Sequence, residues 1–236
     1  MAGDPRAAAS AVPLARLALV IGATGLIGRA LCRELAARTG AYRDVQALVR
    51  RPASGLPASV RVHLVDFEHL NEDTFPAVQD VYCSLGTTRA EAGSADAFRR
   101  VDHDYVVHCA RLARARGAER FALVSALGAS CDSRMLYNRT KGAAERDVSA
   151  LGFDCLVIAR PSLLGGERAG LGQRARPLEA LALALMRPLA FLVPPRYRPV
   201  DPDSLATALI AQVLAPTAAV VVLESDEIQA TRRGRS

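Results

Sequence analysis

The 236-residue sequence predicts an α/β fold with a doubly wound parallel sheet. Short continuous apolar runs, of the kind buried in parallel sheets, alternate with helical patterns along most of the chain. The first run ends in a glycine-rich turn that opens a helix. Because 50% of the residues are hydrophobic, the chain can build the two-sided core that such a sheet needs.

The first predicted strand, residues 17–21, leads directly into the turn and then into a helix that runs to about residue 38. Glycines here allow a tight turn, let backbone N–H groups approach a pyrophosphate, and let helix pack closely on strand. This context predicts dinucleotide binding, with the cofactor-binding residues Gly22, Thr24, Gly25, Leu26, Ile27 and Gly28 in this turn.

The second predicted strand, residues 45–49, ends in Arg50 and Arg51. An acidic residue at this place would accept hydrogen bonds from the adenosine 2′-hydroxyl, whereas arginine suits a 2′-phosphate. We therefore expect NADP(H) to be preferred over NAD(H). The alternative is that two arginines merely end a strand in an arginine-rich protein.

Two further strands bring polar and small residues to the same edge of the sheet. Residues 60–65 end at Asp66 and Phe67, where the carboxylate is placed to receive the adenine amino group. Residues 78–85 end in Leu85, Gly86, Thr87 and Thr88, which suit close passage of a cofactor. A helix over residues 95–116 follows, with Gly117 as its end.

The alternation continues with a strand at 120–125, a helix from Tyr137 to about residue 150, and a strand at 155–159 that ends in Arg160, Pro161 and Ser162. Beyond it we expect a glycine-rich loop at 165–172, an apolar helix at 178–193, a helix at 204–214 and a strand at 219–223. The predicted organisation is a disordered segment at 1–15, one Rossmann domain at 16–228 with a small substrate-side portion mainly at 161–214, and a disordered basic tail at 229–236.

Tyr137 and Lys141 are the strongest candidates for chemistry. Lys141 is the only lysine among 30 lysine and arginine residues. Positions i and i+4 of a helix share one face, so the phenol and the ammonium can address one bound molecule. The competing interpretation is an ordinary surface pair between Lys141 and Glu145.

Composition narrows the function classes. Aromatic residues make up 5% and tryptophan is absent, so despite a net charge of +6 we expect a small-molecule substrate and no nucleic acid. The most apolar window is interrupted by charges and too short to span a bilayer, which predicts no integral membrane association. Five cysteines without a Cys-x-x-Cys pair predict a reducing cytoplasm, no disulfides and no metal site.

With these segments in order, the chain resembles the short-chain dehydrogenase/reductase superfamily. Within its atypical, extended-like branch it is similar to the group that contains the Tat-interacting protein, through residues 85–90, 101–105, 123–129, 137–142 and 159–162. The resemblance implies that Tyr137 is the general acid or base and that Lys141 holds the nicotinamide ribose. It also implies that Arg50 and Arg51 bind the 2′-phosphate and Asp66 the adenine.

The chain departs from the family pattern at the third catalytic position, where the usual Ser-Ser reads Ser125-Ala126. Ser125 takes that role only if the register shifts by one, which would turn it to the opposite strand face; Ser130 and Ser133 are further candidates. Three functions stay open: an NADP(H)-dependent oxidoreductase for a small carbonyl or alcohol, an NADP(H)-sensing binding protein, and a sugar-nucleotide epimerase, which the small C-terminal portion disfavours. The helices at 95–116 and 138–150 are candidates for a homodimer interface.

Overall fold

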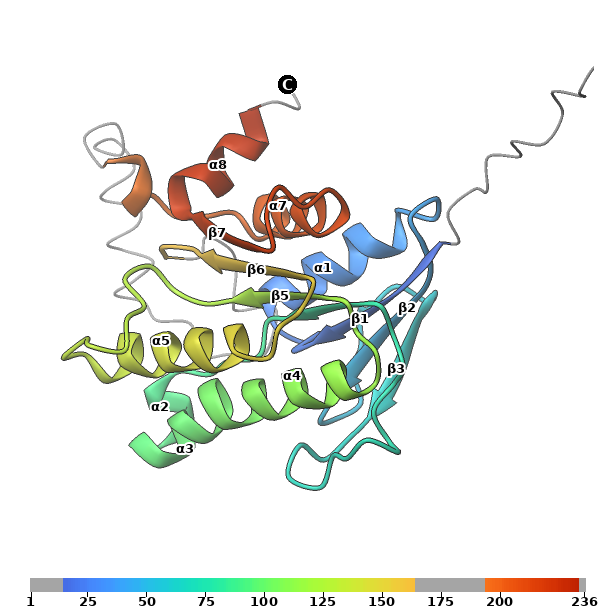
Figure 1. Ribbon diagram of the computed structural model, residues 1–236, viewed down its shortest axis with the longest axis horizontal. Coiled ribbons are helices and arrows are strands. Elements are labelled where there is room, and N and C mark those ends of the chain that lie inside the picture. Colours follow the sequence, from blue (N-terminus) through green and yellow to red (C-terminus); the bar gives the residue numbers. More distant parts are fainter. Residues whose placement is uncertain (1–14, 164–193, 234–236) are drawn as a thin grey trace, which may run out of the picture.

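A computed structural model describes residues 15–163 and 194–233. Its seven strands are all parallel and form one sheet in the order β3-β2-β1-β4-β5-β6-β7 (Figure 1). The predicted doubly wound α/β fold is confirmed.

The strands are β1 (Arg16–Ile21), β2 (Tyr42–Val49), β3 (Val60–Leu64), β4 (Asp80–Cys83), β5 (Arg120–Val124), β6 (Cys155–Arg160) and β7 (Val220–Glu224). The helices are α1 (Leu26–Ala36), α2 (Arg89–Ala92), α3 (Ala95–Arg99), the π-helix η1 (Arg100–Asp104), α4 (Tyr105–Ala115), α5 (Leu136–Ser149), the 3-10 helix η4 (Pro195–Tyr197), α7 (Pro202–Leu214) and α8 (Ser225–Arg233).

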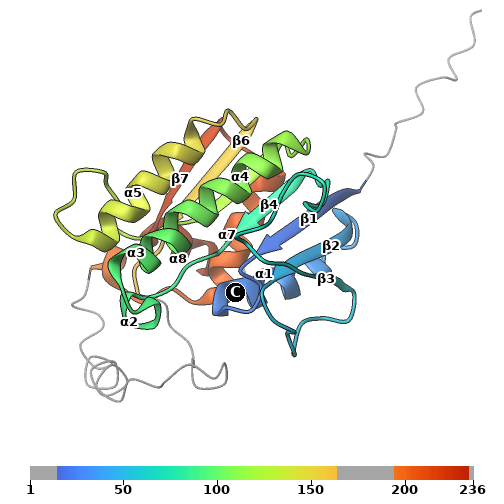
Figure 2. The same ribbon diagram turned by 90° about the horizontal axis from the view of Figure 1, so that it is seen from below.

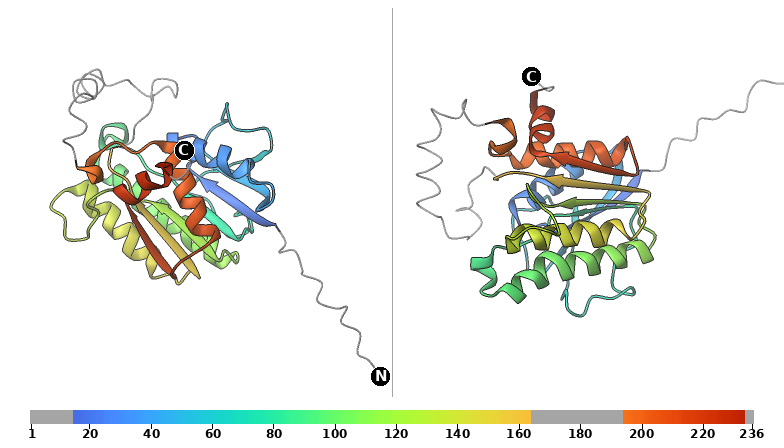
Figure 3. Two further views of the ribbon diagram at one scale, coloured as in Figure 1. Left: turned by 90° about the horizontal axis from the view of Figure 1, so that it is seen from above. Right: turned by 60° about the vertical axis from the view of Figure 1, so that its left-hand side comes forward.

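Helices cover both faces of the sheet. Helices α1, α7 and α8 lie on one face, and α3, α4 and α5 lie on the other (Figures 1 and 3). Each face buries its own apolar cluster, because alternate residues of the strands point to opposite sides. In the view of Figure 2, α4 and α5 run side by side across one face of the sheet.

The strand order reverses at β1, which pairs with β2 on one side and β4 on the other. Ligands of such sheets bind in the crevice outside the carboxyl ends of the strands at this point. Gly22, directly after β1, has a φ of +84°, which a residue with a side chain rarely adopts. A Cβ atom there would also lie 2.8 Å from the carbonyl carbon and oxygen of Ser84, which follows β4. Only glycine fits this turn.

The predicted helix at 95–116 is interrupted by the π-helix η1 over residues 100–104. The interruption places the carboxylate of Asp102 inside the protein, where its side chain is 1% exposed. Single π turns inside α-helices occur frequently at functional sites. Periodicity alone did not predict this turn because it shifts the helix by only one residue.

The C-terminal part differs from the prediction in two ways. Helix α7 packs its buried leucines into the core against α1, so it belongs to the sheet's covering layer and not to a substrate-side portion. Residues 229–233, expected to be disordered, continue helix α8 because Ile228 is fully buried and Gln229 Nε2 donates to the Arg198 carbonyl at 3.0 Å. The expected segments at 1–14, 165–172, 178–193 and 234–236 lie outside the described residues.

The helix that carries Tyr137 and Lys141 sits close against the preceding loop. A Cβ atom on Gly142 would overlap with the backbone of Ser130 and Cys131. The absence of a side chain at Gly142 therefore sets how far α5 can approach this loop.

We expect Gly142→Ala to lower the free energy of unfolding by about 1–3 kcal/mol, because the new methyl group overpacks a backbone contact. Gly40→Ala is the matched control, since nothing lies within 4 Å of a Cβ atom there. Chemical denaturation of both variants measures the difference. Equal stability of the two variants would contradict the close approach of α5 to the loop.

Candidate active site

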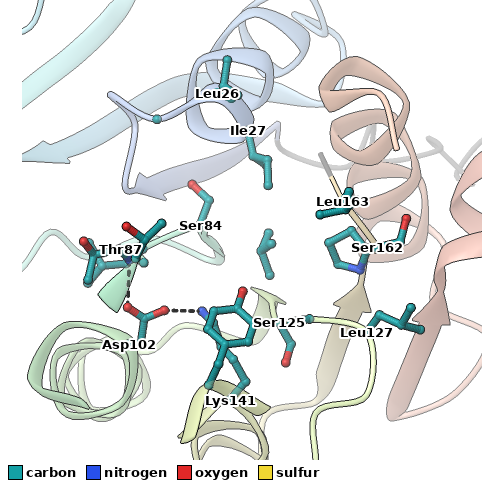
Figure 4. Close-up of a pocket in the computed structure, with 18 of the residues that line it drawn as sticks. Leu26, Ile27, Ser84, Thr87, Asp102, Ser125, Leu127, Lys141, Ser162 and Leu163 are labelled. Atoms are coloured by element: carbon teal, nitrogen blue, oxygen red, sulfur yellow. Dashed lines mark hydrogen bonds and ion pairs between the residues drawn. The ribbon is translucent and has the colours of Figure 1, made fainter. Parts of the chain in front are cut away.

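A cavity of about 680 Å³ opens at the carboxyl ends of the strands. Its volume is in the range of small-molecule and cofactor sites. The walls come from the β1–α1 turn, the segments after β4, β5 and β6, and the helices η1 and α5 (Figure 4). The lining residues that the sequence predicted are Gly25, Leu26, Ile27, Leu85, Gly86, Thr87, Thr88, Ser125, Tyr137, Lys141, Pro161 and Ser162.

The N-terminus of α1 forms one end of the cavity. Its N-cap residue Gly25 has no side chain to cap the helix, and the first turn contains no acidic residue. Backbone N–H groups are therefore free to meet an anion, and the helix dipole favours one. Gly22 and Gly28 do not line the cavity but shape the turn, because a Cβ atom on Gly28 would overlap with the Gly22 carbonyl. This glycine cradle fits the pyrophosphate of a dinucleotide, although the exposed Thr24 also lies outside the cavity lining.

The residues predicted for the adenosine half are not part of the cavity wall. Arg50 and Arg51 are exposed after β2. Asp66 is held by its own turn: His69 Nδ1 lies 2.8 Å from one carboxylate oxygen, and the Glu68 N–H donates to the other at 3.0 Å. The hydrogen bond from His69, followed by that from Glu68, lowers the pKa of Asp66.

Phe67, predicted alongside Asp66, has a different place from the one expected. Its ring is buried and stacks on Tyr105, with 5.7 Å between the ring centroids. The side chain therefore anchors the segment after β3 to helix α4. Only the backbone of Phe67 is then available to contact a cofactor.

Lys141 is buried and bound to a carboxylate that the sequence did not identify. Its Nζ lies 2.9 Å from Asp102 Oδ1, and the two side chains are 7% and 1% exposed (Figure 4). Burial lowers the pKa of Lys141, but the charge of Asp102 and then that of Tyr137 raise it, with a net increase. Asp102 is itself fixed, because its Oδ2 accepts the Thr87 N–H at 2.8 Å.

Tyr137 and Lys141 both line the cavity, so the structure brings the predicted pair to one site. Tyr137 is 41% exposed and packs on the buried Phe98, with 5.7 Å between ring centroids. The competing interpretation fails, because the carboxylate of Glu145 is bound by Arg160 and Ser125. Lys141 is thus directed into the fold and toward the cavity.

Ser125 and Arg160 form a separate polar cluster beside the cavity. The Ser125 hydroxyl donates to Glu145 Oε1, and Arg160 binds Glu145 through Nη2 at 2.6 Å and Nε at 3.1 Å. Arg160 also pairs with Glu224 at 3.2 Å. Contrary to the prediction, the Arg160 side chain thus ties α5 to β6 and β7 and lies outside the lining of the cavity.

Ala126 has no hydroxyl, and neither of the loop serines considered for this role replaces it. Ala126 itself lines the cavity. Ser130 and Ser133 are outside the lining, and their hydroxyls accept N–H groups of Asp132 and Met135 at 3.2 Å. Tyr137 on α5 and Tyr197 on η4 are the two phenols among the described residues that line the cavity.

The sequence missed several residues of the cavity wall, which are Ser84, Arg89, Glu91, Asp102, Val124, Leu127, Leu163 and Tyr197. Asp102 was part of a family motif but had no assigned role. One feature could have marked it, which is the need of a buried lysine for a counter-charge. Tyr197 is distant in sequence from the other wall residues, so no local pattern marks it, whereas Leu163 directly follows the predicted Pro161 and Ser162.

In residues 15–163 and 194–233, no group of three or more histidine, cysteine or acidic side chains is placed to hold a metal ion. Within these same ranges, no helix has both the length and the apolar character needed to cross a membrane.

A family model described as NAD(P)H-binding matches residues 22–180. A protein of *Eremothecium gossypii* named "Protein FMP52, mitochondrial" is 43% identical over 152 residues, which cover 64% of this chain and 67% of that protein. "Protein HTATIP2" of *Rattus norvegicus* is 41% identical over 169 residues, which cover 69% of this chain and 67% of that protein. The similarity to the Tat-interacting-protein-like group is thereby confirmed.

Solved structures of sugar-nucleotide enzymes share the fold. MoeE5 in complex with UDP-glucose and NAD has a TM-score of 0.65 at 19% identity, over 92% of this chain and 81% of that chain. UDP-glucuronic acid 4-epimerase from *Bacillus cereus* in complex with NAD has a TM-score of 0.64 at 15% identity, over 91% and 80%. At this identity the likeness concerns the fold alone.

The expectation of a cytoplasmic protein is wrong in view of these relatives. FMP52 proteins of *Eremothecium gossypii*, *Debaryomyces hansenii* and *Saccharomyces cerevisiae* are all named as mitochondrial. The expectation rested on free cysteines, which indicate a reducing environment but do not identify the compartment that provides it.

We expect Ser125→Ala to lower the free energy of unfolding by about 1–2 kcal/mol, because Glu145 loses a hydrogen bond inside the fold. NADPH affinity should not change, since the hydroxyl donates away from the cavity. Ser130→Ala, which removes an exposed loop hydroxyl, is the control and should lower the free energy of unfolding by no more than about 0.5 kcal/mol. Denaturation and NADPH titration of both variants give the measurement; a loss of NADPH affinity in Ser125→Ala would return this serine to the cofactor site.

Proposed function

The chain belongs to the NAD(P)H-binding family, and from this premise we propose that it is an NADP(H)-dependent oxidoreductase acting on a small carbonyl or alcohol. The observation that carries the proposal is that Tyr137 and Lys141 line one cavity together with the uncapped N-terminus of α1. A proton-transfer group and an anion site thus share one cavity. Bound NADPH would supply a hydride to the carbonyl carbon, and a proton on the oxygen completes the alcohol.

In this proposal Tyr137 donates the proton to the substrate oxygen. Its phenol is partly exposed, so it can regain a proton from water after each turnover. Lys141 holds the ribose hydroxyls next to the nicotinamide, because an ammonium has three donors and Asp102 occupies one direction. Leu26 and Ile27 bind the pyrophosphate through backbone N–H groups, whereas the Gly25 N–H donates to the Gly22 carbonyl at 3.1 Å.

A preference for NADP(H) over NAD(H) rests on Arg50 and Arg51. Both are exposed and follow β2, the strand next to β1 on the side of the adenosine half. Arginine offers a fork of N–H donors that matches phosphate oxygens. Asp66, after the next strand, is proposed to receive the adenine amino group.

A second candidate is a binding protein that senses NADP(H) without turnover. It is favoured by the lack of a substrate-orienting hydroxyl, since Ala126 supplies none and Ser125 donates to Glu145. Losing a donor aimed at developing charge typically costs about 10²–10³ in rate.

The names of the FMP52 relatives favour a mitochondrial location for the chain.

We expect Tyr137→Phe to reduce the rate of NADPH oxidation about 10²–10⁴-fold across a panel of small aldehydes and ketones, because the general acid is lost. NADPH affinity, read from the cofactor's fluorescence, should stay unchanged. Tight NADPH binding without turnover by the wild type on any member of the panel would favour the sensor, and lack of NADPH binding would refute both functions.

We expect Arg50→Ala to weaken NADPH binding about 10-fold or more while NADH binding changes little, because a charge-assisted contact to a phosphate is worth roughly 1.5–3 kcal/mol. Arg43→Ala is the matched control, since Arg43 is an exposed arginine near the opposite end of the same strand. Titration of each variant with both cofactors measures the ratio. Equal losses for NADPH and NADH would contradict the 2′-phosphate assignment.

A further inference from the structure

Arg29, near the start of α1, joins the β1–α1 turn to the loop that follows β2. Its Nε donates to the Thr24 carbonyl at 3.1 Å, and its Nη1 donates to the Ser54 carbonyl at 2.8 Å. Thr24 lies in the glycine turn, and Ser54 lies three residues after Arg51. One guanidinium therefore connects the segment proposed for the pyrophosphate with the segment proposed for the 2′-phosphate.

The loop is shaped to receive the Arg29 side chain. Gly55 has a φ of +75°, a backbone conformation that residues with a side chain rarely adopt. A Cβ atom on Gly55 would lie 2.7 Å from Arg29 Nη1, which is too close for the guanidinium to keep its place. The glycine therefore both turns the chain and leaves room for the arginine.

The part of the loop that Arg29 contacts is its exposed tip. Ala53 and Leu56 pack against the apolar cluster on the α1 face, whereas Ser54 and Gly55 between them are exposed. The apolar contacts hold the loop on the sheet. Because a guanidinium offers its donors in a rigid planar fork, its bonds to two carbonyls also fix the loop relative to the turn.

Three arginines in this region have no acidic partner in the part of the chain that the structure describes. Arg29 binds backbone carbonyls, and Arg50 and Arg51 are exposed without an ion pair. By contrast, Arg33, one turn further along α1, pairs with Asp203 at 2.6 Å. Several uncompensated positive charges favour an anion with more than one negative charge, as a phosphate monoester has near neutral pH.

We propose that Arg29 is a positioning residue for the choice of cofactor: it holds the loop after β2 against the glycine turn and so keeps Arg50 and Arg51 where the 2′-phosphate binds. The inference rests on the proposed function and assigns its NADP(H) preference to a contact outside the cavity. A loop that is ordered before the cofactor arrives lowers the entropic cost of binding. NADH has a hydroxyl in place of the 2′-phosphate, so its binding does not need the loop in this position.

The first test compares the two cofactors in titrations that follow the fluorescence of the reduced nicotinamide. Arg29→Ala should weaken NADPH binding about 5–100-fold, because two arginine side chains must then be ordered on binding, and should change NADH binding by no more than about twofold. Arg33→Ala is the matched control on the same helix and should change neither affinity. A merely structural role of Arg29 would weaken both cofactors equally, and that result would overturn the proposal.

Gly55→Ala tests the same contact with Arg29 left in place. The added methyl group displaces the guanidinium from Ser54, so NADPH affinity should fall while NADH affinity is retained. Gly117→Ala is the control for backbone strain, because Gly117 has a φ of +87° and nothing lies within 4 Å of a Cβ atom there. Unchanged NADPH affinity in Gly55→Ala would contradict the proposal.

The double variant Arg29→Ala/Gly55→Ala shows whether the two changes act through one contact. It should bind NADPH no more weakly than the weaker of the two single variants, since each change removes the same interaction. Losses that add in the double variant would mean that Gly55→Ala acts on the loop independently of Arg29, and would overturn the proposal.

Arg29→Lys separates positioning from charge. A lysine keeps the positive charge but lacks the planar fork that reaches both carbonyls. NADPH affinity should therefore recover only in part relative to Arg29→Ala. Full recovery would show that the charge alone is needed and would overturn the positioning role.

Hydrogen exchange of the backbone amides of residues 53–56 tests the loop without any cofactor. These amides should exchange faster in Arg29→Ala than in the wild type, while Arg33→Ala should leave them unchanged. A wild type that prefers NADPH, with a loop that Arg29→Ala does not affect, would overturn this inference alone. A wild type that binds no NADPH would instead refute the proposed function on which it rests.

Discussion

The close contact between the β1–α1 turn and the end of β4 determines where everything else in the site lies. Gly22 has no room for a side chain against the Ser84 backbone, and the Ser84 hydroxyl donates back to the Ile21 carbonyl at 3.1 Å. This contact lies at the point where the strand order of the sheet reverses. The N-terminus of α1 and the segment with Gly86 and Thr87 are thereby held on the same cavity.

The parts of the site that follow from local sequence could be predicted. The glycine turn and the Tyr137–Lys141 helix depend on backbone conformation and on spacing within one element, so their residue types alone indicate them. The sheet could be predicted for the same reason, since each strand is a short apolar run. Periodicity placed these elements to within a few residues of their bounds in the structure.

The contacts between distant segments could not be predicted. Glu145 follows Lys141 by one helical turn, yet it binds Arg160 from a later strand, and Lys141 binds Asp102 from an earlier helix. Sequence spacing suggested Glu145 as the partner of Lys141. Spacing within one helix does not show which side chains of distant segments the fold brings near. Arg160 was assigned to the cofactor on its position at a strand end, although the fold supplies it with two carboxylates.

The π-helix has a consequence for how this stretch of chain should be compared with its relatives. Each residue of an α-helix advances the side-chain direction by roughly 100°, so a π turn acts as one inserted residue that rotates all that follows. Asp102 and the buried face of α4 point inward together only because that extra residue is present. Relatives that lack one residue here would need a gap in the alignment at this turn, and an ungapped comparison would match Asp102 with a side chain on another face of the helix.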